Sequence, residues 1–229
     1  MFKKKHATPA VTLKETWKDG DTVTKLSFFI MGLNAIKHRQ WVKGFSLLFA
    51  EIVFLVWFFL SGIHSIAGLS NLGAIKSKRV VFDKAQGVYV TQQPDSSVLI
   101  LLFGILALFI VAGFIYLYII NLKSNKHTFL LEKRHEHIPT NREEIASLFD
   151  QRLHATLMTI PIVLIILFTV LPTVFMISMA FTNYDRQHSV GFSWTGFQAF
   201  GNVLSGDLAG TFFPVLGWTL IWAVAATAS

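Results

Sequence analysis

Two ionisable side chains, Glu51 and His64, interrupt an otherwise apolar segment at residues 44–69. An ionisable group within a membrane-spanning helix is a candidate for transport or proton relay, because its burial in hydrocarbon is costly. The two residues are thirteen positions apart, so on one helix they lie at different depths and cannot pair with each other. Each lies toward one end of the segment, where its side chain can reach the headgroups or pair with another helix. We favour this structural role and keep proton relay as the alternative.

Three histidines, His127, His135 and His137, lie in a short stretch that is crowded with charges. Side chains at positions i and i+2 of a helix do not face the same way, and no carboxylate-rich cage accompanies them, so a solvated loop is favoured over a metal site. The sequence has no cysteine, and it has no P-loop, G-x-S-x-G or H-E-x-x-H motif. We therefore predict no catalytic residue, cofactor or metal site on this chain. An enzyme is not expected, and a membrane enzyme without a simple motif is the weakest alternative.

The composition indicates a membrane protein. Of 229 residues, 53% are hydrophobic and only 14% are charged, and the mean hydropathy is +0.54. Soluble domains contain about 25% charged residues. The formal net charge of +7 could indicate nucleic-acid binding, but no aromatic and basic platform accompanies the charges. No nucleic-acid partner is therefore expected.

Four apolar segments are long enough, or nearly so, to cross a bilayer, which takes roughly 20 residues of helix. They comprise residues 44–69, 98–120, 157–181 and 212–229, and the sequence ends inside the fourth. These runs lack the alternation of membrane strands, and a helix satisfies its own backbone hydrogen bonds in lipid. The predicted fold class is an all-α polytopic membrane protein with about four transmembrane helices, the fourth truncated.

The distribution of Lys and Arg predicts the orientation of these spans. Residues 1–43 contain nine, residues 70–97 four, residues 121–156 six and residues 182–211 one. Basic residues are enriched in cytoplasmic loops. We therefore expect the N-terminus and the second connection in the cytoplasm, the first and third connections outside, and the chain in the cell membrane.

The connections are expected to contain local structure. Residues 24–43 carry apolar side chains at helical spacing beside basic ones, which predicts an amphipathic helix at the inner membrane surface, with packing on a soluble partner as the alternative. Two β-prone runs, residues 80–82 and 88–90, predict a small external hairpin. Thr140 and Glu143 have the spacing of a capping box and predict that a helix begins there.

The end of the third apolar segment and the stretch after it carry a recognisable motif. The sequence LPTVFMISMAFTNYD, followed by FSWTGFQAFGNVL, resembles the permease subunits of binding-protein-dependent sugar ABC importers. The positions that carry this resemblance are Pro172, Ala180, Phe181, Thr182, Asn183, Tyr184, Trp194, Gly196, Phe197 and Phe200.

A second likeness lies nearer the N-terminus. Residues 28–58 resemble the N-terminal region of the MalF-type permease subunit of maltose/maltodextrin importers from Gram-positive bacteria, and residues 218–229 resemble the start of its next helix. The likeness covers most of the chain from Leu26 onward. Members of this family carry further helices and a cytoplasmic loop that couples to the ATPase, which this sequence lacks. We therefore expect the N-terminal portion of such a permease, either as a truncated gene product or as a partial sequence.

The resemblance implies a permease subunit that forms half of a translocation pore and moves maltose/maltodextrin-type oligosaccharides into the cell. The implied partners are a second permease subunit, two ATPase subunits, an extracellular sugar-binding lipoprotein and membrane lipid, with ATP and Mg²⁺ on the ATPase subunits. Substrate-binding and ATPase-coupling residues are expected beyond Ser229, so none is carried over. The alternative is a stand-alone membrane scaffold or regulatory protein without transport activity.

Overall fold

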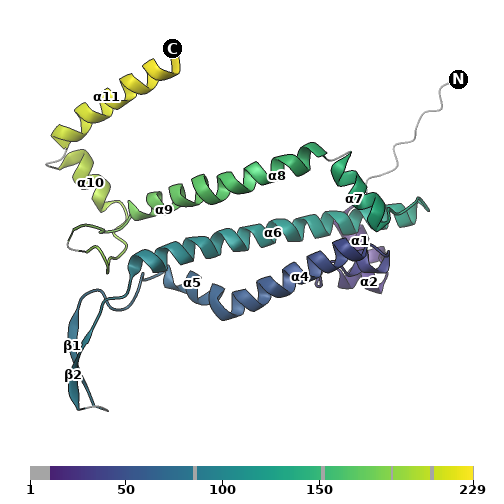
Figure 1. Ribbon diagram of the computed structural model, residues 1–229, viewed down its shortest axis with the longest axis horizontal. Coiled ribbons are helices and arrows are strands. Elements are labelled where there is room, and N and C mark those ends of the chain that lie inside the picture. The colour runs from purple at the N-terminus through teal and green to yellow at the C-terminus, as the bar shows by residue number, and fades with distance from the viewer. Residues whose placement is uncertain (1–10, 85–86, 151–152, 187, 207–208, 229) are drawn as a thin grey trace. The chain divides into compact units, whose positions relative to one another are not determined.

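The computed structural model describes residues 11–84, 87–150, 153–186, 188–206 and 209–228 (Figure 1). The first ten residues of the predicted cytoplasmic region 1–43 thus lie outside the described residues. The chain divides into two compact units, of which one comprises Met1–Ile63 with Ala107–Ile166 and the other His64–Leu106 with Leu167–Ser229. They are called the first unit and the second unit.

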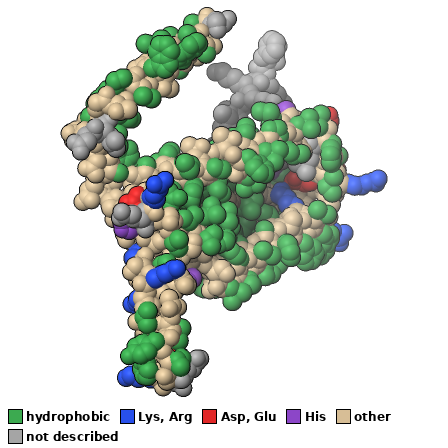
Figure 2. All heavy atoms as spheres, turned by 60° about the vertical axis from the view of Figure 1, so that its left-hand side comes forward, with side chains coloured by type: hydrophobic (Ala, Val, Ile, Leu, Met, Phe, Trp, Pro, Cys, Tyr) green, Lys and Arg blue, Asp and Glu red, His purple; other side chains and the backbone are tan. Residues whose placement is uncertain are grey.

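The predicted fold class is confirmed, because four helices of the described chain have the length and composition to cross a membrane. These are Trp41–Gly68, Ser97–Lys133, Leu153–Met179 and Ala209–Ala228. Apart from the C-terminal end of Ser97–Lys133, the ends of these helices lie within four residues of the ends of the predicted segments. Such a difference is ordinary for helix boundaries. Their most apolar windows are between 0% and 22% buried within the chain, and Figure 2 shows hydrophobic side chains covering much of the helical surface on one face. Most of the apolar surface is therefore available to lipid or to partner helices.

The regular secondary structure in the described part of the first unit is entirely helical. Its elements are α1 (Leu13–Asp19), α2 (Thr22–Leu26), α3 (Leu33–Lys37), α4 (Trp41–Trp57), a π-helical turn (Phe58–Gly62), α6 (Ser97–Lys133) from Ala107 onward, α7 (Asn141–Phe149) and α8 (Leu153–Ile165).

Helix α6 continues well past the predicted span 98–120 and ends at Lys133. The apolar run ends where Asn121 begins a polar stretch, but the helix does not end there, because some of its polar side chains contact protein instead of water. Asn121 and Asn125 are each only 3% exposed, and Phe129 is 8% exposed. The membrane boundary and the helix boundary are therefore different residues in this element.

The prediction of one continuous amphipathic helix over residues 24–43 is wrong. The structure has two short helices, α2 and α3, and then a separate start of α4 at Trp41. Gly32 has a φ of +82°, and a Cβ at this position would lie 2.2 Å from the carbonyl oxygen of Gly44. Only glycine tolerates both the left-handed backbone and this close approach. The chain therefore turns at Gly32 instead of continuing as a helix.

Two amides of α6 hold this turn against the spans. The Asn121 side chain donates to the Ser27 carbonyl at 2.9 Å and accepts from the Gly32 N–H at 3.1 Å. The Asn125 side chain donates to the Thr24 carbonyl at 3.1 Å. These five residues are called the Asn121 cluster. Backbone groups that the break between α2 and α3 leaves without helical partners thus find partners on α6.

Helix α7 begins at the predicted capping box. The Thr140 N–H donates to the Glu143 carboxylate at 2.8 Å, and the Thr140 side chain caps the same turn in return. This reciprocal pairing satisfies N–H groups that have no partner within the helix. Glu144 then lies 3.0 Å from the Lys43 ammonium, so α7 is fastened to the first turn of α4.

The second unit contains the hairpin and the helices that follow the third span. Its elements are α5 (Ile63–Gly68, from its second residue), β1 (Arg79–Asp83), β2 (Val88–Gln92), the first part of α6, α9 (Leu171–Met179), α10 (Gln198–Ser205) and α11 (Ala209–Ala228), and a π-helical turn (Ile166–Val170) precedes α9.

The predicted β-hairpin is confirmed. Strands β1 and β2 are antiparallel, with Val81 opposite Val90, and the rings of Phe82 and Tyr89 are 5.1 Å apart. The turn is closed by the Gly87 N–H, which donates to the Asp83 carbonyl at 2.8 Å. Residues 85–86 lie outside the described residues. Cross-strand side-chain pairs of this kind stabilise an otherwise marginal two-stranded sheet.

Candidate functional site

The polar residues that end the third span close a loop in the second unit. Thr182 forms an isolated antiparallel bridge with Trp194. The Asn183 N–H donates to the Ser193 carbonyl at 3.1 Å, and the Asn183 side chain accepts from the Ser193 N–H at 2.6 Å. The two halves of the sequence motif are therefore in direct contact.

Phe181 connects this loop to α10. Its carbonyl accepts from the N–H groups of Thr195 and Gly196, at 2.9 and 3.0 Å. Its ring centroid lies 5.3 Å from that of Phe197 and 5.2 Å from that of Phe200. Gly196 has a φ of +61°, which glycine adopts without strain. The aromatic contacts fix the start of α10 beside the end of α9.

The remaining motif positions lie along the same path. Pro172 is the second residue of α9, directly after the π-helical turn and inside the continuous helix Leu153–Met179, and Ala180 directly follows this helix. The ring centroids of Tyr184 and Phe192 are 5.6 Å apart, and the two rings are nearly perpendicular. The motif thus marks residues that shape the turn from the third span into α10, and the structure assigns none of them to chemistry.

Sequence reasoning missed a group of buried polar contacts that hold this loop to the connection between the first two spans. Ser97 is fully buried, and its hydroxyl donates to the Leu72 carbonyl at 2.5 Å and accepts from the Phe192 N–H at 3.1 Å. The Lys76 ammonium donates to the Leu72 and Phe192 carbonyls, at 3.0 and 2.6 Å. These four residues are called the Ser97 cluster. A serine and a lysine in polar connections gave no local signal for it.

The Ser97 cluster depends on the absence of a side chain at Gly191. A Cβ there would lie 2.2 Å from the Lys76 carbonyl oxygen, far inside van der Waals contact. Burial lowers the pKa of the Lys76 ammonium, and the attraction of Asp95 opposes this shift. A separate contact holds the loop that follows α9 to the end of the first span, because the Trp194 indole N–H donates to the Leu69 carbonyl at 2.6 Å.

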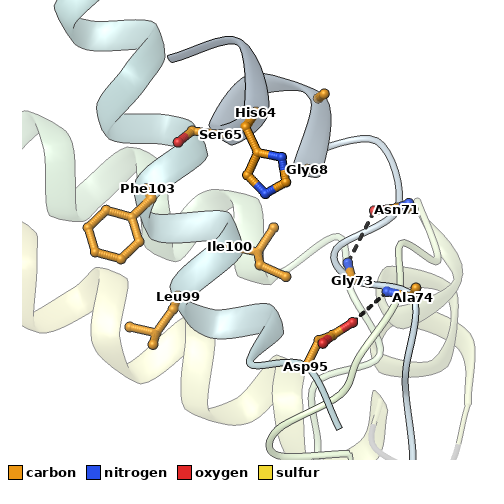
Figure 3. A pocket seen from close by; sticks show the side chains of 11 residues that line it. His64, Ser65, Gly68, Asn71, Gly73, Ala74, Asp95, Leu99, Ile100 and Phe103 are labelled. Atoms are coloured by element: carbon orange, nitrogen blue, oxygen red, sulfur yellow. Dashed lines mark hydrogen bonds between the residues drawn. The ribbon is translucent and has the colours of Figure 1, made fainter. Parts of the chain in front are cut away.

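His64, one of the two predicted intramembrane candidates, lines a cavity of about 630 Å³ (Figure 3). Leu99, Ile100 and Phe103, from the first turns of α6, form an apolar part of its wall, and Asp95 lies at its edge. A cavity that combines apolar side chains with a few polar groups is suited to binding a small ligand. His64 is exposed, so it contributes to a hollow surface and not to a closed core.

Asp95 also shapes the loop at this cavity. Its carboxylate accepts from the N–H groups of Ala74 and Ile75, at 2.7 and 2.9 Å. These backbone hydrogen bonds lower the pKa of the Asp95 carboxyl, because they stabilise its charged form. The cavity therefore has a fixed negative charge at neutral pH.

Glu51, the other predicted intramembrane candidate, lies in the first unit on α4. Its carboxylate accepts from the Met31 N–H at 2.7 Å, and Met31 is fully buried. The contact is with the turn between α2 and α3 and not with another transmembrane helix. Glu51 thus supports the same turn as the Asn121 cluster.

His127, His135 and His137, which were considered as metal ligands, are all exposed. His137 lies 2.8 Å from the Glu143 carboxylate, whereas His127 lines a pocket between α4, α6 and α7. Within the described ranges, no group of three or more His, Cys, Asp and Glu side chains could hold a metal ion.

Known proteins similar to this chain are permeases of sugar transport systems. The chain is 31% identical over 208 residues to the maltodextrin transport system permease protein MdxF of Bacillus subtilis, which is 86% of the chain and 43% of that protein. It is 29% identical over 213 residues to the galactooligosaccharides transport system permease protein GanP of the same organism, 90% of the chain and 46% of that protein. The maltodextrin transport system permease protein MalC of Streptococcus pneumoniae is 29% identical over 206 residues, 86% of the chain and 43% of that protein. The chain spans less than half the length of these curated relatives.

No protein-family model and no solved structure matches the chain. The permease homologues and the four apolar helices together identify a multi-pass integral protein of the cell membrane. The resemblance to sugar permeases of Gram-positive bacteria is confirmed by the same relatives.

Proposed function

We propose that this chain, whose homologues are sugar transport system permeases, is part of a permease subunit of an ABC importer and contributes to half of its translocation pore. The observation that carries the proposal is the similarity to these permeases over 86–90% of the chain. Four apolar helices support it, because a pore through lipid requires helices that satisfy their own backbone hydrogen bonds.

The proposed importer contains a second permease subunit, two ATPase subunits that hold ATP and Mg²⁺, and an extracellular sugar-binding lipoprotein. The spans Leu153–Met179 and Ala209–Ala228 are 0% buried in their most apolar windows. Such surfaces can contact the helices of a second permease subunit as well as lipid. ATP hydrolysis is assigned to the ATPase subunits.

We propose a neutral oligosaccharide of the maltodextrin type as the substrate, in line with the relatives MdxF and MalC. The relative GanP is a galactooligosaccharides permease, so both sugar classes belong in the test. In a strain that lacks the gene encoding this chain, uptake of labelled maltotriose is expected to be lost, and the intact gene is expected to restore it. Uptake of glucose is the control and is expected to stay unchanged.

Loss and restoration of galactotriose uptake alone would replace the maltodextrin assignment while keeping the importer. Unchanged uptake of both trisaccharides would overturn the importer proposal itself. Purification of the tagged chain from native membranes provides a second test, in which a second permease and an ATPase subunit are expected to co-purify. Purification without an ATPase, together with unchanged uptake, would instead support a membrane scaffold or regulatory protein.

A further inference from the structure

We infer that a pocket in the first unit binds the phosphate group of an anionic phospholipid. The pocket has a volume of about 490 Å³ and lies between α4, α6 and α7. Its wall includes the cationic side chain of Lys123, the imidazole of His127 and the hydroxyl groups of Ser46 and Ser124. These groups supply N–H and O–H donors for hydrogen bonds to phosphate oxygens, and Lys123 also supplies a positive charge that attracts the phosphate.

The position of the pocket along α6 matches the depth of lipid headgroups. Ile120, the last residue of the uninterrupted apolar run, also lines the pocket. Lys123 and His127 follow three and seven residues later, which is about 4.5 and 10 Å along the axis at 1.5 Å per residue. The headgroup region extends about 5–8 Å beyond the hydrocarbon on each side. A lipid whose tails lie beside the span therefore has its phosphate at the level of Lys123, and His127 lies one turn farther from the hydrocarbon.

The side chains of Lys123 and His127 are available to contact a ligand in the pocket. The two residues are one turn apart on the same side of α6, and both are exposed. Within the described part of the chain, neither side chain forms a hydrogen bond or ion pair with protein. Glu144 also lines the pocket, but it lies 3.0 Å from the Lys43 ammonium, which balances its charge.

The apolar part of the wall favours a phospholipid over a free phosphate ion. Val42, Ile120 and Ile145 line the pocket beside the polar groups. An inorganic ion makes no use of such side chains, whereas the glycerol and the first methylene groups of a lipid do. The Lys123 charge favours an anionic over a zwitterionic lipid, since the cationic headgroup of the latter is repelled.

The test compares lipid retention by variants of the full chain. The chain is reconstituted in nanodiscs with equal amounts of phosphatidylglycerol and phosphatidylcholine, and retained lipids are counted by native mass spectrometry. The wild-type chain is expected to retain phosphatidylglycerol in preference. Lys123→Gln is expected to lower this preference about fivefold, as one basic residue near the surface contributes. Lys126→Gln is the matched control, because Lys126 lies on the same helix but does not line the pocket.

A second variant separates the pocket from the general positive charge. Ser124→Phe fills the pocket without changing any charge, and it is expected to abolish the preference for phosphatidylglycerol. An equal loss in Lys126→Gln, or an unchanged preference in Ser124→Phe, would overturn the proposal. Displacement of phosphatidylglycerol by excess inorganic phosphate would also overturn it, in favour of a free-anion site. Thermal unfolding in detergent is expected to be unchanged in Lys123→Gln, and none of these results depends on sugar transport.

Discussion

The two units both bury polar side chains to hold a connection in place, but they use different chemistry. In the first unit, the amide of Asn121 joins the Gly32 N–H and the Ser27 carbonyl, which lie 89 and 94 positions away. In the second unit, Ser97 and Lys76 gather carbonyl oxygens from two connections. In the first unit one amide both donates and accepts, so it satisfies both kinds of backbone group. In the second unit the Ser97 hydroxyl has both functions, and the Lys76 ammonium adds a group that only donates.

This difference teaches that the polar residues near the ends of the spans have two separate roles. Some mark where the chain meets water, as Lys and Arg do in the loops. Others, such as Asn121 and Ser97, are 3% and 0% exposed and serve as packing elements. The same residue type can have either role. Substitutions that disturb one contact in each unit test which of the two clusters contributes more to local stability.

The largest effect is expected from Asn121→Leu in the first unit. The substitution leaves the buried Gly32 N–H and the Ser27 carbonyl without a partner, and each lost partner costs about 1–3 kcal/mol. The free energy of local opening is therefore expected to fall by about 3 kcal/mol. Hydrogen exchange at the Gly32 amide in nanodiscs is expected to accelerate on the order of a hundredfold.

The control for this experiment is Asn202→Leu, because Asn202 is exposed on α10 in the second unit. It is expected to leave exchange at Gly32 unchanged. Equal exchange rates in the two variants would show that the Asn121 cluster does not hold the turn.

A smaller effect is expected from Gly191→Ala in the second unit. The new Cβ would lie 2.2 Å from the Lys76 carbonyl oxygen, so the backbone must shift, which costs about 2 kcal/mol. Exchange at the Phe192 amide measures the loss. Gly201→Ala is the matched control, since a Cβ there has no heavy atom within 4 Å and alanine is favoured in a helix by up to about 1 kcal/mol. Equal rates of hydrogen exchange at the Phe192 amide in the two variants would rule out a tight contact at Gly191.

Substitution of Glu51 distinguishes a structural role of this residue from a role in transport. Glu51→Ala leaves the buried Met31 N–H without a partner and is expected to weaken the turn by about 1–2 kcal/mol. Glu51→Gln keeps an acceptor and is expected to preserve most of the protection of the Met31 amide in hydrogen exchange. Uptake is expected to survive in Glu51→Gln. Protection of Met31 with complete loss of uptake would instead support a proton relay through Glu51.

The smallest effect is expected from acid, and Asp21 in the first unit and Asp95 in the second unit are suitable carboxylates for measuring it. Burial opposes ionisation of Asp21, but hydrogen bonds from Thr24 and Lys37 outweigh it and hold the pKa of that carboxyl well below its ordinary value. Backbone hydrogen bonds lower the pKa of Asp95. Because both values are lowered by folding, the stabilising contribution is complete above the ordinary value of 3.8 and is lost as the pH falls through the lowered value.

Local stability of both units is therefore expected to decline in acid, as measured by hydrogen exchange corrected for its intrinsic pH dependence. Asp95→Asn is expected to remove the decline at the Ala74 amide alone, and Asp21→Asn the decline at the Thr24 amide alone. A decline that is unaffected by either variant would place the titrating group elsewhere.

Local patterns predicted several elements correctly. The spans follow from long apolar segments, the hairpin from two short β-prone runs around Gly87, and the start of α7 from the spacing of Thr140 and Glu143. Each of these signals depends on residues that are close in the sequence. The helix predicted over residues 24–43 failed, because periodicity does not report that a Cβ at Gly32 would collide with Gly44.

The sequence by itself determined that the chain spans a membrane, where its apolar segments lie, and which family of transporters it resembles. Only the tertiary structure decided which polar residues face protein. Asn121, Ser97 and Lys76 form hydrogen bonds with partners that lie 25 to 116 positions away in the sequence. Lys76 also has hydrogen bonds within its own loop. A buried amide or hydroxyl has the same local sequence signature as a solvated one, so its role becomes visible only when folding brings its partner within hydrogen-bond distance.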